Sequence, residues 1–194
     1  ADRPHRRETL ASLLWPDRPD TIARANLRQA LVRVRRALGD GASPSEGDNP
    51  PPKHGRTGRS PPFLFVTLTD VQFNAASDYS LDVAALEAFA RPSAGGPGRR
   101  LQPLPEALCA DFLAGFAVPD SETFQTWVLN RQEYYHRLAL DILEDQNAAF
   151  EAAGDFEHAV AAARLQLRME PWLEEAHRRC MRGLALAGRR DEAL

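Results

Sequence analysis

The sequence predicts a mainly α-helical fold with a short β segment, arranged as a small basic part followed by a longer helical part. Three observations predict this fold. A short helix and a longer basic helix follow one another within the first forty residues. A run rich in β-branched and aromatic residues comes next, which is typical of strands. From about residue 120, apolar residues recur at helical spacing and glycines recur at a fixed interval.

Two helices are predicted at the start of the chain, over Arg6–Leu14 and Ala23–Leu38. Three leucines of the first helix should face inward: Leu10, Leu13 and Leu14. The segment 15–17, Trp-Pro-Asp, ends this helix because proline disfavours helix in the residue before it. Asp20 or Thr21 can cap the second helix. This order of short helix, turn and longer basic helix is that of a helix-turn-helix, whose second helix reads DNA.

The second helix has two distinct faces at about 100° per residue. An apolar stripe is predicted to face the core, and it contains Leu27, Leu31, Val34 and Leu38. The candidate base contacts project from the opposite side: Asn26, Gln29, Arg33 and Arg36. The candidate phosphate contacts line one flank: Arg24, Arg28 and Arg35. The sixteen positions hold five arginines and no acid. Arginine and glutamine suit base edges in a major groove, although a solvated charged helix is the alternative interpretation.

The segment after this helix predicts a wing. Gly39 is a plausible helix C-cap, and Phe63–Phe73 has the composition of a strand or hairpin. Residues 1–75 would then form a winged helix-turn-helix with a short β wing. Residues 40–62 are dense in proline, glycine, serine and charge, which predicts a disordered loop. This loop is either a solubilising insertion or a segment that touches DNA phosphates.

The rest of the chain is predicted to be helical. A helix over Tyr79–Ala90 has Leu81, Leu86 and Phe89 on one side, and a flexible link follows at Arg91–Arg100. A long helix capped by Asp120 or Ser121 would end at Gly154. Asp155 then begins a further helix, which Pro171 interrupts. A last helix is predicted over Trp172–Ala187, and Gly188 ends it.

A 34-residue period runs through the last part of the sequence. Three pairs of residues are 34 apart: Gly154 and Gly188, Ala159 and Ala193, and Val160 and Leu194. This period, with alanine where paired helices cross, predicts a tetratricopeptide-like domain over residues 78–194. Generic helical hairpins are the alternative. The pattern stops in mid-repeat, so we expect this chain to be a fragment of a longer protein.

Charge separates a basic first part from an acidic second part, and the sequence lacks the features of membrane proteins, secreted proteins, metal-binding proteins and enzymes. The net charge of −3 divides into +5 for residues 1–60, with 12 basic and 7 acidic side chains, and −8 for residues 61–194, with 12 and 20. No membrane span, secretory signal, metal-ligand spacing or catalytic motif is visible in the sequence. We therefore expect no enzyme, cofactor, metal or small-molecule substrate. Cys109 and Cys180 should be free thiols, and Trp15, Trp127 and Trp172 should anchor cores.

Two paired segments carry a resemblance to a known family. LASLLWPD and ARANLRQALVRVRRALGD look like the DNA-binding half of bacterial transcriptional activator domain proteins, which include antibiotic-regulatory activators with an OmpR/PhoB-like winged helix. The resemblance continues through FVTLTDVQFNAASDYSLDVAALEAF, DFLAGFAVPDSETFQTWVLNRQEYYHRLAL and EPWLEEAHRRCMRGLALAGRRDEAL. It begins at the family's second helix, so we expect the family's first strands and helix to precede this chain.

The resemblance and the basic helix together predict a DNA-binding transcriptional activator of the bacterial cytoplasm, associated with the nucleoid. Its expected partner is double-stranded DNA. The resemblance implies RNA polymerase or a second activator subunit as a protein partner. The alternative is a signalling scaffold whose helical repeats bind a protein and whose winged helix does not bind DNA. Acid on the outward face of the basic helix would favour the scaffold, and its basic character favours DNA.

Overall fold

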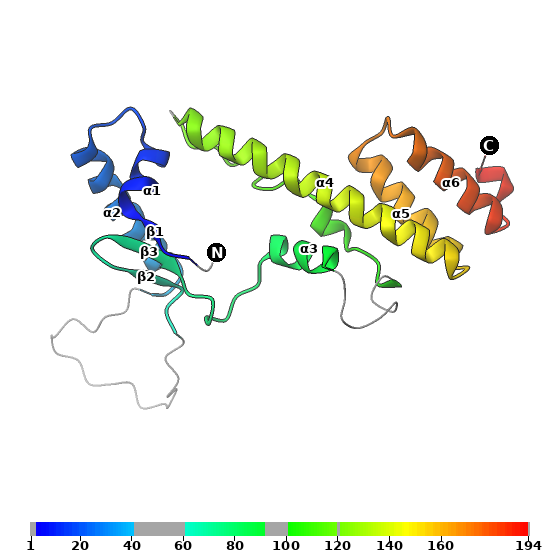
Figure 1. Cartoon of the computed structure of the whole chain (residues 1–194), viewed down its shortest axis with the longest axis horizontal. Helices are drawn as coiled ribbons and strands as arrows, with labels where there is room; N and C mark the ends of the chain where they lie inside the picture. Colours follow the sequence, from blue (N-terminus) through cyan, green and yellow to red (C-terminus); the bar gives the residue numbers. More distant parts are fainter. Residues whose placement is uncertain (1–2, 41–60, 92–100, 120, 194) are drawn as a thin grey trace. The chain divides into compact units, whose positions relative to one another are not determined.

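The computed structural model describes residues 3–40, 61–91, 101–119 and 121–193. The described residues form six α-helices and one three-stranded sheet, which confirms the mainly α-helical fold (Figure 1). Most of the predicted loop at 40–62 and of the link at 91–100 lies outside the described residues, as do Asp120 and Leu194.

The chain divides into two compact units. The first contains residues 1–79 together with 117–126, and the second contains residues 80–116 together with 127–194. The division of the chain into a winged helix at 1–75 and a repeat domain at 78–194 stays a prediction.

The first unit begins with a strand that the sequence did not indicate. β1 (His5–Arg6) precedes α1 (Arg7–Leu14), and α2 (Asp20–Ala37) follows. The prediction that Arg6 starts a helix is therefore wrong. The reason is long-range pairing, since the two residues of β1 lie antiparallel to β3 (Asp70–Phe73).

A small core joins the two helices of this unit. Buried Ala11, Ala23 and Leu27 form its centre, and partly buried side chains surround them: Leu10, Leu14, Trp15 and Leu31. The inward stripe predicted for α2 is only half correct. Val34 and Leu38 are 44% and 42% exposed, because no described element of this unit covers the last turns of the helix.

The predicted strand at residues 63–73 is a hairpin. β2 (Leu64–Val66) pairs antiparallel with β3, and the sheet order is β1-β3-β2. Thr67 organises the turn between the two strands, because its Oγ1 accepts a hydrogen bond from the Asp70 backbone N–H at 2.9 Å. Leu68 lies at the tip of this turn and is 95% exposed.

Asp40 ties the end of α2 to the start of β2. Its two carboxylate oxygens accept hydrogen bonds from the backbone N–H groups of Phe63 at 2.9 Å and Leu64 at 3.0 Å. Asp40, which the sequence assigned to the disordered loop, therefore belongs to the folded unit. The loop is closed at its base by these two charge-assisted bonds.

Replacing this carboxylate should destabilise the first unit. We expect Asp40→Ala to lower the free energy of unfolding by about 2 kcal/mol, since a hydrogen bond to a charged group contributes about 1.5–3 kcal/mol. Asp17→Ala, at an exposed turn residue, is the control with little expected effect. Urea unfolding followed by circular dichroism measures both, and equal stabilities of the two variants would contradict the anchoring role.

The second unit is built on one long helix. α4 (Glu122–Ala152) begins in the first unit and continues in the second from Trp127. Ser121 caps it, since Ser121 Oγ accepts from the Phe124 backbone N–H at 3.3 Å. The other elements of the second unit are α3 (Asp82–Ala90), the 3-10 helix η2 (Glu106–Cys109), α5 (Phe156–Met169), α6 (Glu174–Leu186) and η3 (Arg190–Glu192). Its core contains Leu86, Leu104, Ala139, Ile142, Leu143 and Ala162.

α5 and α6 pack as a helical hairpin with small residues at their contact (Figure 1). Gly154 and Gly188 follow α4 and α6, with positive φ of 75° and 81° that favour glycine. Asp155 caps α5 by accepting from the His158 backbone N–H. Ala159 is fully buried, as predicted, and its carbonyl accepts from Asn147 Nδ2 at 2.7 Å.

Gly183 is a point of close approach between α6 and α5. A Cβ atom at this position would lie 2.7 Å from Cγ2 of Val160, which is itself buried. A β-branched side chain in a helix has little rotamer freedom, so the Val160 side chain cannot easily rotate away from an added Cβ atom. Packing against Val160 therefore favours glycine at position 183 of α6, although alanine is the better helix former.

A pair of substitutions tests this contact. Gly183→Ala alone should lower the free energy of unfolding by about 1–3 kcal/mol through overpacking. In a Val160→Ala background the same change should raise it by about 0.5–1 kcal/mol, because only the helix propensity gain remains. Thermal or urea unfolding of the four proteins measures the coupling. The same sign of effect in both backgrounds would show that the two positions do not touch.

Two of the three tryptophans are not core anchors. Trp15 packs against the core of the first unit, but Trp127 is 38% exposed and Trp172 is 92% exposed. Trp172 was predicted to start a helix, whereas α6 begins at Glu174. The indole therefore lies in the turn before α6, where no neighbouring helix covers it.

Both cysteines are free and half-buried. Burial raises the pKa of the Cys109 thiol, and the nearby Arg168 guanidinium opposes that shift. A raised thiol pKa keeps the less reactive protonated form at neutral pH.

Candidate nucleic-acid interface

The surface of α2 that faces away from the core carries one continuous stripe. Ala25, Gln29, Val32 and Arg36 follow each other at spacings of four, three and four residues, and all four are exposed. Helical geometry places residues at these spacings on one face. The stripe lies opposite the buried Ala23 and Leu27.

Most of the predicted base contacts are accessible on or beside this stripe. Gln29 and Arg36 lie in it, and Arg33 is exposed at its edge. Asn26 was predicted to project outward, but it is half-buried because it lies on the side of the helix nearer the core. The face therefore presents two guanidinium groups and one amide.

The three flanking arginines differ in their surroundings. Arg28 is exposed. Arg24 Nη2 lies 3.0 Å from Glu8 Oε1 and 3.9 Å from Asp20 Oδ2. Arg35 is half-buried, and its Nη2 donates to the Asp40 carbonyl at 3.5 Å. Arg28 is thus the flanking guanidinium most accessible to a ligand.

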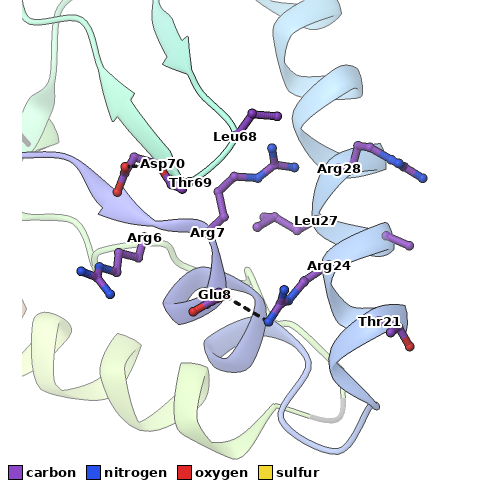
Figure 2. A pocket seen from close by; sticks show the side chains of 11 residues that line it. Arg6, Arg7, Glu8, Thr21, Arg24, Leu27, Arg28, Leu68, Thr69 and Asp70 are labelled. Atoms are coloured by element: carbon purple, nitrogen blue, oxygen red, sulfur yellow. Dashed lines mark hydrogen bonds and ion pairs between the residues drawn. The ribbon is translucent and has the colours of Figure 1, made fainter.

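A pocket of about 780 Å³ lies beside the flank of α2. Figure 2 shows it between α2, the turn after β2 and the junction of β1 with α1. Its charged lining consists of Arg6, Arg7, Arg24, Arg28, Glu8 and Asp70. Arg6 and Arg7 were not predicted to belong to a site, because they line this pocket only through the pairing of β1 with β3.

The pocket has an excess of positive charge. Glu8 is engaged by Arg24, as the dashed line in Figure 2 marks, and Asp70 Oδ2 accepts from Thr69 Oγ1 at 2.6 Å. Arg7 Nη1 donates to the Thr67 carbonyl at 3.1 Å, which holds its guanidinium near the turn. Guanidinium groups bind phosphate oxygens with charge-assisted, often bidentate hydrogen bonds. The pocket therefore suits an anion.

Two other kinds of site were sought in the described part of the chain. No group of three or more metal-ligating side chains lies together there. Within the same residues, none of the helices combines the length and the apolar character that a membrane crossing needs.

The fold and this site define a class of protein, in which a small unit with two successive helices, the second rich in arginine, and a hairpin is joined to a unit of packed helices. Comparison with family models narrows the class. The model of the bacterial transcriptional activator domain family matches residues 81–194, more than half of the chain, and the protein belongs to this family. Neither the curated proteins nor the solved structures gave a match.

Proposed function

We propose that the protein is a DNA-binding transcriptional activator in which α2 lies in the major groove of double-stranded DNA. The observation that carries the proposal is the outward face of α2, where Gln29, Arg33 and Arg36 are exposed and residues 23–38 contain no acid. Membership of a family of bacterial transcriptional activators supports it. We further propose that the protein acts in the cytoplasm, at the nucleoid, and that it has no enzymatic activity.

The order of elements in the first unit supports a winged helix-turn-helix of the OmpR type. β1, α1, α2 and the β2–β3 hairpin follow one another, and the sheet places β3 between β1 and β2. In this arrangement α2 is the reading helix and the hairpin is the wing. The turn at Thr67–Asp70 then lies beside the DNA backbone.

The arginine-lined pocket supplies the contacts that are independent of sequence. A phosphate between α2 and the hairpin turn would lie beside the Arg7 guanidinium, with the exposed Arg28 on α2 and Arg6 adding positive charge (Figure 2). Such contacts position the helix on the duplex without reading bases. Arg24 contributes less here, because Glu8 already neutralises it.

The second unit acts on a protein partner, either RNA polymerase or a second activator subunit. The tight hairpin of α5 and α6 supports a tetratricopeptide-like domain, as do the two glycines of positive φ 34 residues apart. Such repeats present helical surfaces to other proteins.

The salt dependence of DNA binding tests the proposal. The whole chain is titrated with duplex DNA of random sequence over a range of salt concentrations, and log K should fall linearly with log salt by about 0.9 per phosphate contacted. Arg28→Ala should reduce the slope by about 0.9. Arg137→Ala, whose Nε lies 2.5 Å from Glu133 Oε1 on an exposed surface of α4, is the control without effect.

Two results would contradict the proposal. Binding that is absent at low salt would favour the signalling scaffold, in which the first unit does not bind DNA. Equal losses for Arg28→Ala and Arg137→Ala would show an association driven by net charge rather than by the α2 surface.

A further inference from the structure

The outward stripe of α2 alternates between apolar and hydrogen-bonding side chains. Ala25 and Val32 are apolar, whereas Gln29 and Arg36 carry donors, and all four are exposed. Val32 is 54% exposed, more than any other valine or leucine of this helix. An apolar side chain at the centre of this face can contact an apolar group of whatever the face binds, which the hydrogen-bonding residues cannot do.

The surroundings of Val32 limit what that partner is. Arg28 and Arg36 lie one turn before and one turn after it on the same side of the helix, and both are exposed. A surface that covers Val32 must therefore also accept the charge of these two arginines. A DNA groove meets both demands, since its phosphates are anionic and its floor offers one apolar group, the C5-methyl of thymine.

We propose that Val32, with Ala25 two turns before it on the same stripe, is a specificity-determining residue that contacts thymine methyl groups in the major groove. This inference rests on the proposed function of α2 as the reading helix. Gln29 and Arg36 flank Val32 along the stripe, and their donor geometry suits adenine and guanine respectively. The recognised sequence then contains a thymine between the bases that these two side chains read.

The experiment removes the C5-methyl group of single thymines in the DNA. The whole chain first selects its preferred duplex from a random pool. Each thymine of that duplex is then replaced singly by deoxyuridine, which keeps base pairing and removes only the methyl. We expect one or two positions at which affinity falls about fourfold, the effect of one buried methyl-sized group at about 0.8 kcal/mol.

A variant assigns the effect to Val32. Val32→Ala should bind the thymine and deoxyuridine duplexes with nearly equal affinity at the sensitive position. Val34→Ala is the matched control, since Val34 has the same side chain, lies on the same helix and is 44% exposed, but sits outside the outward stripe. This control should retain the fourfold preference for thymine. Circular dichroism confirms that both variants are folded.

The outcomes separate the inference from the proposed function. Failure to select any duplex overturns the proposed function and the inference with it. A selected duplex that is indifferent to deoxyuridine at every position overturns the inference alone. The inference is also overturned if Val32→Ala and Val34→Ala lose the thymine preference to the same extent.

Discussion

Arg36→Ala is expected to reduce the affinity for the selected duplex roughly 5- to 150-fold, with a much smaller loss for random DNA. A bidentate contact between arginine and guanine contributes roughly 1–3 kcal/mol of discrimination, which corresponds to this range. Arg36 is the last residue of the exposed stripe of α2, on the side opposite the buried Ala23 and Leu27. Arg33→Ala should act in the same direction but less strongly, because Arg33 lies at the edge of the stripe.

Titration of both variants with the selected and the random duplex measures this discrimination. Arg28→Ala is the internal comparison, since a phosphate contact lowers both affinities alike. Equal losses on the two duplexes for Arg36→Ala would move Arg36 to the phosphate-contacting group. Unchanged affinity for both duplexes would remove α2 from the interface.

Ala159→Leu is expected to lower the free energy of unfolding of the second unit by about 1–3 kcal/mol, through overpacking of a close helix contact. Ala159 is fully buried, and Ala163 of α5 and Ala176 of α6 are equally buried. The Ala159 carbonyl also accepts from Asn147, so a shift of α5 to make room disturbs a buried hydrogen bond. Activation in cells should fall accordingly.

Ala161→Leu is the matched control for this prediction, because Ala161 is exposed on the same helix. It should change stability by no more than about 0.5 kcal/mol. Urea unfolding measures both variants, and a reporter assay measures activation. An Ala159→Leu protein that is as stable and active as the parent would contradict the tight hairpin.

Local signals allowed the helical part to be predicted well. Asp155 caps α5 and Gly154 ends the preceding turn because both signals act within a few residues. The burial of Ala159 was predicted from the 34-residue period, because paired helices of such a repeat would cross at that position. In contrast, β1 consists of two residues that are defined only by their pairing with β3, and no local sequence pattern predicts such a short strand.

The candidate interface was predicted less completely, for reasons that lie in tertiary contacts. Arg24 and Arg28 appear alike in sequence, but only Arg24 meets Glu8 from α1. Arg6 and Arg7 join the arginine-lined pocket through the sheet. Val32 lies outside the apolar stripe predicted for α2, but it was not predicted as a contact because only polar and charged residues were considered on the outward face.

Site-specific photo-crosslinking to duplex DNA would show whether the outward face of α2 lies on DNA. A photoreactive amino acid replaces Val32 in one protein and the exposed Tyr134 of α4 in another. Each is irradiated with labelled duplex at low salt. We expect a DNA adduct from position 32 and none from position 134. No adduct from position 32 under conditions in which the protein binds DNA would contradict the placement of α2 on DNA.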